Sequence, residues 1–126
     1  MVKLASLHLE ERHFLENLSC PTFASQPWVE GAVLKERRVA IISTAGLHMA
    51  DDRPFTSNEG DFYRIIPGDV QSNNLIMSHV SVNFDRSGFY QDLNVVFPID
   101  RMRELVEDGI VGSIASFHYS FMGAID

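Results

Sequence analysis

The run from Val39 to His48, Val-Ala-Ile-Ile-Ser-Thr-Ala-Gly-Leu-His, constrains the fold of this chain most strongly. Its first four residues are apolar and mostly β-branched, with charged residues before them and small residues after them. This pattern is typical of a strand buried on both faces, so residues 39–43 are predicted to form a central parallel strand. The turn that follows places hydroxyl groups at the carboxyl end of the strand, where open α/β sheets bind ligands.

Further apolar runs predict the rest of the sheet. Strands are expected near 75–78, 93–97 and 110–115, with a shorter one at 62–67. Residues 99–108 form the clearest helix, since proline precedes it and glycine follows it. Because right-handed crossovers turn such repeats into layers, the predicted fold is an α/β three-layer sandwich with a mainly parallel, doubly wound (Rossmann-like) sheet.

The length of 126 residues suits a single α/β domain with one hydrophobic core. We expect an N-terminal helix within residues 1–18, a connector at 19–36 and the core at 37–126. The loop after His48 has turn formers and charges but no period, so it is expected to act as a lid or to be held by charge pairs of Arg53 and Arg64.

Charge and cysteine content exclude several classes of function. A net charge of −7 argues against nucleic acid and against an anionic membrane surface as partners. No apolar run is long enough to cross a membrane and the N-terminus lacks a signal-peptide core, so a cytoplasmic location is expected. The single cysteine, Cys20, excludes an internal disulfide, a Cys-x-x-Cys pair and a thiolate zinc cluster within this chain.

Three histidines each follow a predicted strand: His48, His79 and His118. Imidazoles exchange protons near neutral pH, so these side chains are predicted to orient or protonate a substrate as catalytic residues. The alternation of apolar and polar residues from His79 to Asp85 indicates either a solvated strand face or the wall of a site. The predicted substrate-binding residues are Ser43, Thr44, Gly46, Asn83 and Asp85.

The same histidines also allow a metal hypothesis. His48, His79, His118 and Asp85 would suit zinc or iron(II) if they converged on one point, but their spacing does not impose convergence. The sequence contains no Ser-His-Asp triad pattern, phosphate-binding glycine loop or dinucleotide fingerprint. We therefore expect no metal and no other cofactor.

Several segments together resemble the glycine/sarcosine/betaine/D-proline reductase selenoprotein B family. These segments are Arg38–His48, Met77–Arg86, Asp92–Arg101 and His118–Gly123. In that family a Sec-x-x-Cys or cysteine equivalent, downstream of the Phe-Met-Gly stretch, carries out reductive cleavage of an amine substrate. This sequence contains no such thiol pair, so the resemblance is to the N-terminal part of the family.

The resemblance implies a reductase component that supplies a pocket for a small amine or amino-acid-like substrate. The chain is then either the N-terminal part of a split or truncated reductase or a self-sufficient protein that kept the pocket. The alternatives are a non-catalytic subunit that binds a small molecule or a partner, and a metal-dependent enzyme that uses the three histidines. Expected partners are the small substrate and the C-terminal reductase half or another reductase subunit.

A homo-oligomer is also expected, because the chain has more aromatic side chains than one small domain easily buries. The residues on which this expectation rests are Phe84, Phe89, Tyr90, Phe117, Tyr119 and Phe121.

Overall fold

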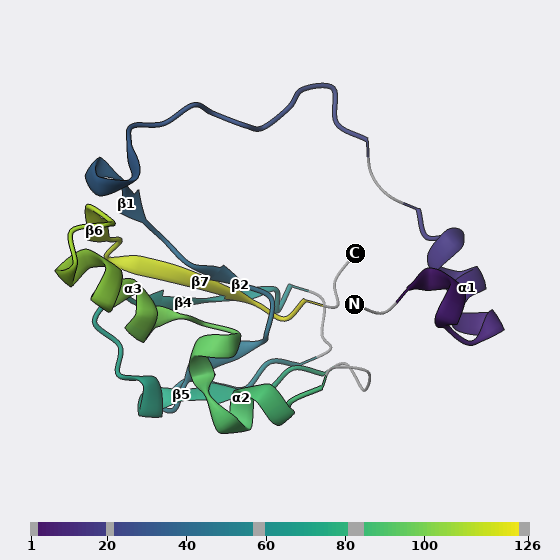
Figure 1. Cartoon of the computed structure of the whole chain (residues 1–126). Helices are drawn as coiled ribbons and strands as arrows, with labels where there is room; N and C mark the ends of the chain where they lie inside the picture. Colours follow the sequence, from purple (N-terminus) through teal and green to yellow (C-terminus); the bar gives the residue numbers. More distant parts are fainter. Residues whose placement is uncertain (1–2, 20–21, 57–59, 81–84, 124–126) are drawn as a thin grey trace. The chain divides into compact units, whose positions relative to one another are not determined.

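The computed structural model describes residues 3–19, 22–56, 60–80 and 85–123. The chain divides into two compact units, Met1–Glu30 and Gly31–Asp126. The first unit holds a 3-10 turn, η1 (Leu4–Ser6), and the helix α1 (Leu9–Glu16), within the segment predicted to be helical (Figure 1). Cys20 lies outside the described residues. No helix in the described ranges is long and apolar enough to cross a membrane.

The second unit is built around the strand β7 (Phe117–Phe121), which has a partner on each side. The strand β2 (Ile42–Ser43) runs parallel to β7, and β4 (Tyr63–Pro67) runs antiparallel to it (Figure 1). Four other strands form two separate two-stranded sheets. β1 (Arg38–Val39) pairs in parallel with β6 (Ser113–Ile114), and β3 (Leu47–Met49) pairs antiparallel with β5 (Leu75–Met77).

The prediction of a three-layer sandwich with a mainly parallel, doubly wound sheet is wrong. The strands form one mixed sheet, one parallel pair and one antiparallel pair, and the predicted strand at 75–78 belongs to the antiparallel pair. The predicted central strand at 39–43 is split into β1 and β2. β2 is an edge strand of its sheet, and Ile42 on this strand is 68% exposed. An apolar β-branched run therefore marked a strand, but it could not show how many neighbours that strand would have.

The segments predicted as strands at 93–97 and 110–115 have a different secondary structure, for local reasons. Residues Leu93–Val95 form a 3-10 turn, η4, because the Asp92 carboxylate accepts hydrogen bonds from the backbone N–H and side-chain amide of Asn94. Such side-chain bonds compete with strand ladders. The N–H groups of Ile110 and Val111 both donate to the Leu105 carbonyl, so these residues end the preceding helix. Within the predicted strand at 110–115, Ser113–Ile114 is the part that forms a strand.

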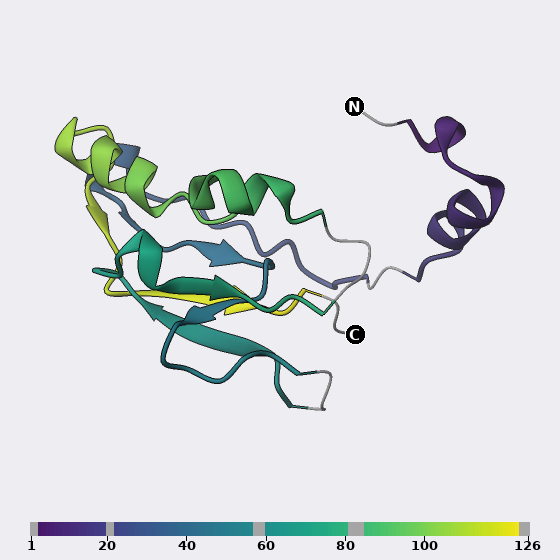
Figure 2. The same cartoon turned by 90° about the horizontal axis from the view of Figure 1, so that it is seen from below.

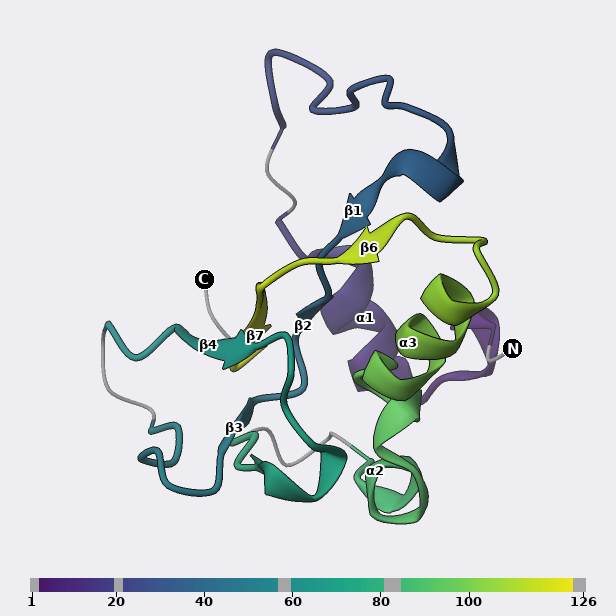
Figure 3. The ribbon, with the colours of Figure 1, turned by 90° about the vertical axis from the view of Figure 1, so that its left-hand side faces the viewer.

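The strongest helix prediction is confirmed by α3 (Ile99–Glu107). Gly109, at φ +67°, ends it in a Schellman motif in which the Gly109 N–H donates to Val106 and the Ile110 N–H to Leu105. A further short helix, α2 (Ser87–Gln91), precedes η4. α2 and α3 lie on one side of the sheet, as Figure 2 shows across the strands and Figure 3 along them.

The core lies between these helices and the inner face of the strands. Its fully buried apolar side chains are Leu47, Ile66, Phe97 and Ile99. Asp100, at the start of α3, accepts a hydrogen bond of 2.6 Å from Ser72 and one of 2.9 Å from Arg103. Arg103 also donates to the carbonyls of Gly68 and Val70, so one charged cluster ties α3 to the segment before β5.

A second charged cluster holds the loop between β3 and β4. The buried guanidinium of Arg64 lies 2.6 Å from the Asp61 carboxylate and 4.2 Å from the centroid of the Phe55 ring. Asp61 also pairs with Arg53 at 3.2 Å and accepts hydrogen bonds from the backbone and side chain of Thr56. The described part of this loop is therefore held by charge pairs, one of the two roles predicted for it.

These bonds make the loop sensitive to acid. The hydrogen bond from Arg64, followed by that from the Thr56 N–H, holds the pKa of Asp61 well below its usual range. A carboxyl group whose pKa is lower in the folded state stabilises the fold above its unfolded pKa and loses that contribution as the pH falls. We expect the free energy of unfolding to decrease below about pH 4, and less steeply in Asp61→Asn.

Urea unfolding between pH 3 and pH 7 measures this dependence. Asp51→Asn, which replaces an exposed carboxylate in the same loop, should follow the wild-type pH profile. Identical profiles for the wild type and Asp61→Asn would contradict the proposed contribution of the ion cluster.

Candidate functional site

The turn that follows β2 meets two other segments at one corner of the sheet. Within this turn, the Gly46 N–H donates to the Phe121 carbonyl at 2.9 Å and the Gly46 carbonyl accepts from the Ser78 N–H at 3.0 Å. The parallel β2–β7 pair and the antiparallel β3–β5 pair therefore end close together. The predicted site residues Thr44, Gly46 and His79 are brought into one place by this arrangement.

Glycines allow the segments to approach so closely. Gly46 has φ +65°, and a Cβ atom at this position would lie 2.9 Å from the Cα of His79. A Cβ atom at Gly123 would lie 2.3 Å from the Thr44 carbonyl oxygen and 3.0 Å from His79 Nε2. Gly123 thus lies between Thr44 and the imidazole of His79, and we call these three residues with Gly46 the corner site.

The serines beside the corner site support the backbone. The Ser43 hydroxyl donates to the Val96 carbonyl at 2.9 Å and accepts from the Ala45 N–H at 3.2 Å. Ser120 accepts from the Leu47 N–H at 2.6 Å. Both serines are buried, so Ser43 holds the turn in position, whereas the neighbouring Thr44 is exposed.

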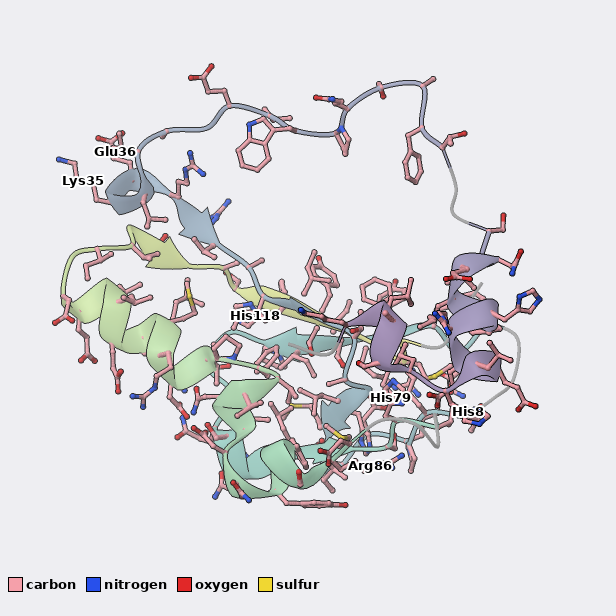
Figure 4. All side chains as sticks on the ribbon, turned by 45° about the vertical axis from the view of Figure 1, so that its right-hand side comes forward. His8, Lys35, Glu36, His79, Arg86 and His118 are labelled. Atoms are coloured by element: carbon pink, nitrogen blue, oxygen red, sulfur yellow. The ribbon has the colours of Figure 1, made fainter. Side chains whose placement is uncertain are left out.

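His79 is the histidine that contributes to the corner site. Burial, and then the positive charge of Arg86, lowers the pKa of its imidazole, so the neutral form is favoured at neutral pH. The Arg86 guanidinium donates to the His79 carbonyl at 2.5 Å, and Figure 4 shows the two residues near one another. Asp85 is exposed and accepts from the Ser87 N–H at 2.9 Å, at the start of α2. The predicted site residue Asn83 lies outside the described residues.

His118 lies elsewhere, as the second residue of β7. Its Nδ1 accepts a hydrogen bond of 2.9 Å from the Ile41 N–H, at the break between β1 and β2. Its ring is fully buried and meets the edge of Phe97 with the centroids 5.6 Å apart. Burial, and then the charge of Arg103, lowers the pKa of His118, so this imidazole is a neutral part of the sheet.

His48 is buried on β3, where its Nδ1 lies 2.7 Å from the Met49 carbonyl. A carbonyl only accepts, so Nδ1 of His48 is the donor in this hydrogen bond. Within the described ranges, no group of three His, Cys, Asp or Glu side chains is placed to hold a metal ion. Figure 4 shows His79 and His118 at separate positions, so the structure gives no support to the metal hypothesis.

Two open clefts lined by described residues lie away from the corner site. One, of about 450 Å³, lies between the turn at Gly68 and Phe117. The other, of about 340 Å³, lies between Arg38 and Tyr119, again beside Phe117. None of the three predicted histidines lines either cleft.

Sequence reasoning gave no site role to Arg86 and Gly123. Arg86 belongs to the polar stretch that begins at Ser78 and contains His79. A cationic residue in the same stretch as a histidine was the signal that the sequence offered. Gly123 ends the Phe-Met-Gly stretch, but a glycine in sequence does not show which segment approaches it. Only the pairing of β2 with β7 places it against Thr44.

The close approach at Gly46 can be tested by adding one methyl group. Gly46 and Gly109 share a positive φ, but a Cβ atom at Gly109 meets nothing within 4 Å. We expect Gly109→Ala to cost about 1–2 kcal/mol through backbone conformation alone. Gly46→Ala should cost at least about 1 kcal/mol more, because its Cβ atom would also collide with the backbone of His79. Chemical denaturation measures both, and equal losses would contradict the tight packing of the corner site.

The neutral state of His118 predicts a second pH dependence. Because its folded pKa is below the unfolded value, the unfolded chain binds the extra proton first, and the fold loses stability as the pH falls below about 6.5. Each such histidine contributes a slope of at most about 1.4 kcal/mol per pH unit. His118→Asn should flatten this slope between pH 7.5 and pH 5, whereas His13→Asn, at an exposed position of α1, should not. An unchanged slope in His118→Asn would show that this imidazole is not held neutral.

Comparison with known proteins identifies a relative. Over 91 residues, or 71% of this chain, the sequence is 40% identical to the D-proline reductase subunit gamma of Acetoanaerobium sticklandii, and the match spans 36% of that protein. No family model matches the chain, and no solved structure matches it. The similarity supports a relationship to a proline-reductase family, which is the broader part of the resemblance seen in the sequence. The narrower assignment to selenoprotein B is not confirmed by it.

Proposed function

We propose that this chain is a component of a reductase that acts on a small amine or amino-acid-like substrate. The observation that carries the proposal is the 40% identity to a D-proline reductase subunit over 91 residues. The selenoprotein B-like motifs agree with it, because they lead to the same class of reaction. D-proline and similar cyclic or N-substituted amino acids are the first substrates to consider.

In this proposal the corner site forms one wall of the substrate pocket. A neutral His79 imidazole can accept a hydrogen bond from a substrate ammonium group, and its lowered pKa favours this neutral form at neutral pH. The exposed Thr44, whose backbone lies against Gly123, is proposed to offer its hydroxyl to the substrate. Asn83 and Asp85 are proposed to complete the polar contacts with the substrate.

His48 and His118 have a different part in this proposal. Each is buried and engages a backbone group, so they position the strands that carry the corner site. Of the three histidines predicted to be catalytic, we propose a direct role for His79. Ser43 likewise acts through the turn that it holds.

Reduction needs an electron carrier that these 126 residues do not supply as a thiol pair. The chain contains a single cysteine, and a thiol or selenol pair requires two such groups. We propose that the pair comes from another reductase segment or subunit. Should no such partner take part, the chain is a non-catalytic subunit that binds the small molecule, which is the second candidate. A cytoplasmic location and a homo-oligomeric state stay predictions.

A chimeric enzyme tests the proposed function. The 91 matched residues of the A. sticklandii subunit are replaced by those of this chain, and the assembled reductase is assayed with D-proline. We expect activity above one tenth of the parent enzyme, and at least a tenfold loss of kcat/KM when His79→Gln is added. Arg101→Gln, at an exposed position of α3, is the control and should leave kcat/KM unchanged. A folded but inactive chimera would contradict the role as a reductase component, and an active chimera insensitive to His79→Gln would contradict the proposed site.

A further inference from the structure

The sheet formed by β2, β7 and β4 has apolar side chains on the face opposite to α2 and α3. Successive residues alternate between a buried and an exposed side chain along β4 and β7. The exposed set consists of Ile42, Tyr63, Ile65, Phe117 and Tyr119, which we call the outer face. These side chains are between 37% and 68% exposed.

The inner face of the same strands has the opposite character. It carries Ser43, Arg64, His118 and Ser120, all buried, with only Ile66 as an apolar member. A sheet with one face exposed to solvent normally has polar side chains on that face and apolar side chains on the buried face. Here the polar residues are covered and the apolar ones are exposed, so the outer face has the composition of a buried surface.

The outer face is continuous. Strand register places Tyr119 opposite both Ile42 and Ile65, and Phe117 opposite Pro67. The rings of Tyr63 and Tyr119 have centroids 6.4 Å apart, and Tyr63 also contacts Phe121 at 5.7 Å. The two clefts beside Phe117 border this surface and provide recesses for incoming side chains. A contiguous apolar patch of this kind marks an interaction site.

The uncovered face and the length of the relative indicate what kind of partner fits. The outer face belongs to a mixed sheet, in which β7 pairs in parallel with β2 and antiparallel with β4. Here α2 and α3 cover the inner face only (Figure 2). The relative extends far beyond the match, since 36% of its length is matched and almost two thirds is not. That unmatched part is long enough to supply a second layer.

We propose that the outer face is the docking surface for the complementary part of a D-proline reductase gamma-type subunit, meaning the segment outside the matched 91 residues. This inference rests on the proposed function, because it takes its partner from the same relative. The docked segment would cover Ile65 and Tyr119 and place side chains in the recesses beside Phe117. The corner site would thereby gain access to the redox groups that the chain itself does not provide.

Co-expression of the full chain with the tagged unmatched segment of the A. sticklandii subunit tests the proposal. We expect the wild-type chain to be retained on the tagged segment, and Tyr63→Asp and Ile65→Asp to lower retention at least tenfold. Tyr90→Asp is the matched control, because Tyr90 is a 76% exposed aromatic residue on α2, on the other side of the sheet. Circular dichroism of each purified variant confirms that it is folded.

The outcomes are distinct. Absence of wild-type retention, or equal retention of the wild type and the outer-face variants, would overturn the proposal. Sedimentation of the chain alone as a homodimer that Ile65→Asp dissociates would overturn it too, because a second copy would then occupy the outer face. Failure of docking with an active chimera leaves the proposed function intact, whereas docking with an inactive chimera contradicts that function and not the surface.

Discussion

The hydrogen bonding of β7 on both sides is the constraint on which the rest of the second unit depends. β7 pairs in parallel with β2 on one side and antiparallel with β4 on the other. The His118 side chain fills the break between β1 and β2 by accepting from the Ile41 N–H. Since that bond requires an unprotonated Nδ1, burial of the ring and continuity of the sheet support one another. Positions far apart in the sequence are thereby fixed relative to a single strand.

The corner site follows from that constraint. The carboxyl ends of parallel strands meet at the same edge of a sheet, so β2 and β7 bring Thr44 and Gly123 together. The antiparallel β3–β5 pair then returns the chain and places His79 against both. Two glycines make this convergence possible, because side chains at either position would collide with neighbouring backbone. A neutral imidazole at this position is suited to accepting a hydrogen bond.

The two faces of the sheet have different roles. The inner face buries polar groups that define the register, whereas the outer face gathers apolar side chains at the surface. Electrostatic clusters around Asp61 and Asp100 hold the segments that connect the strands. The similarity to part of a reductase subunit supports a reductase-component role in general, and the outer face is the surface that we propose for docking.

Local elements whose signals are short in range could be predicted from the sequence. The helix at 99–107, its glycine stop and the strand at 63–67 follow from periodicity and from residues near each boundary. The family resemblance likewise came from contiguous motifs and is supported in its broader form. Tertiary structure alone decided strand direction, the edge position of Ile42 and the contact of Gly123 with Thr44 and His79. The physical reason is that apolar runs encode burial, whereas pairing between residues some 70 positions apart depends on which backbone groups find partners across the sheet.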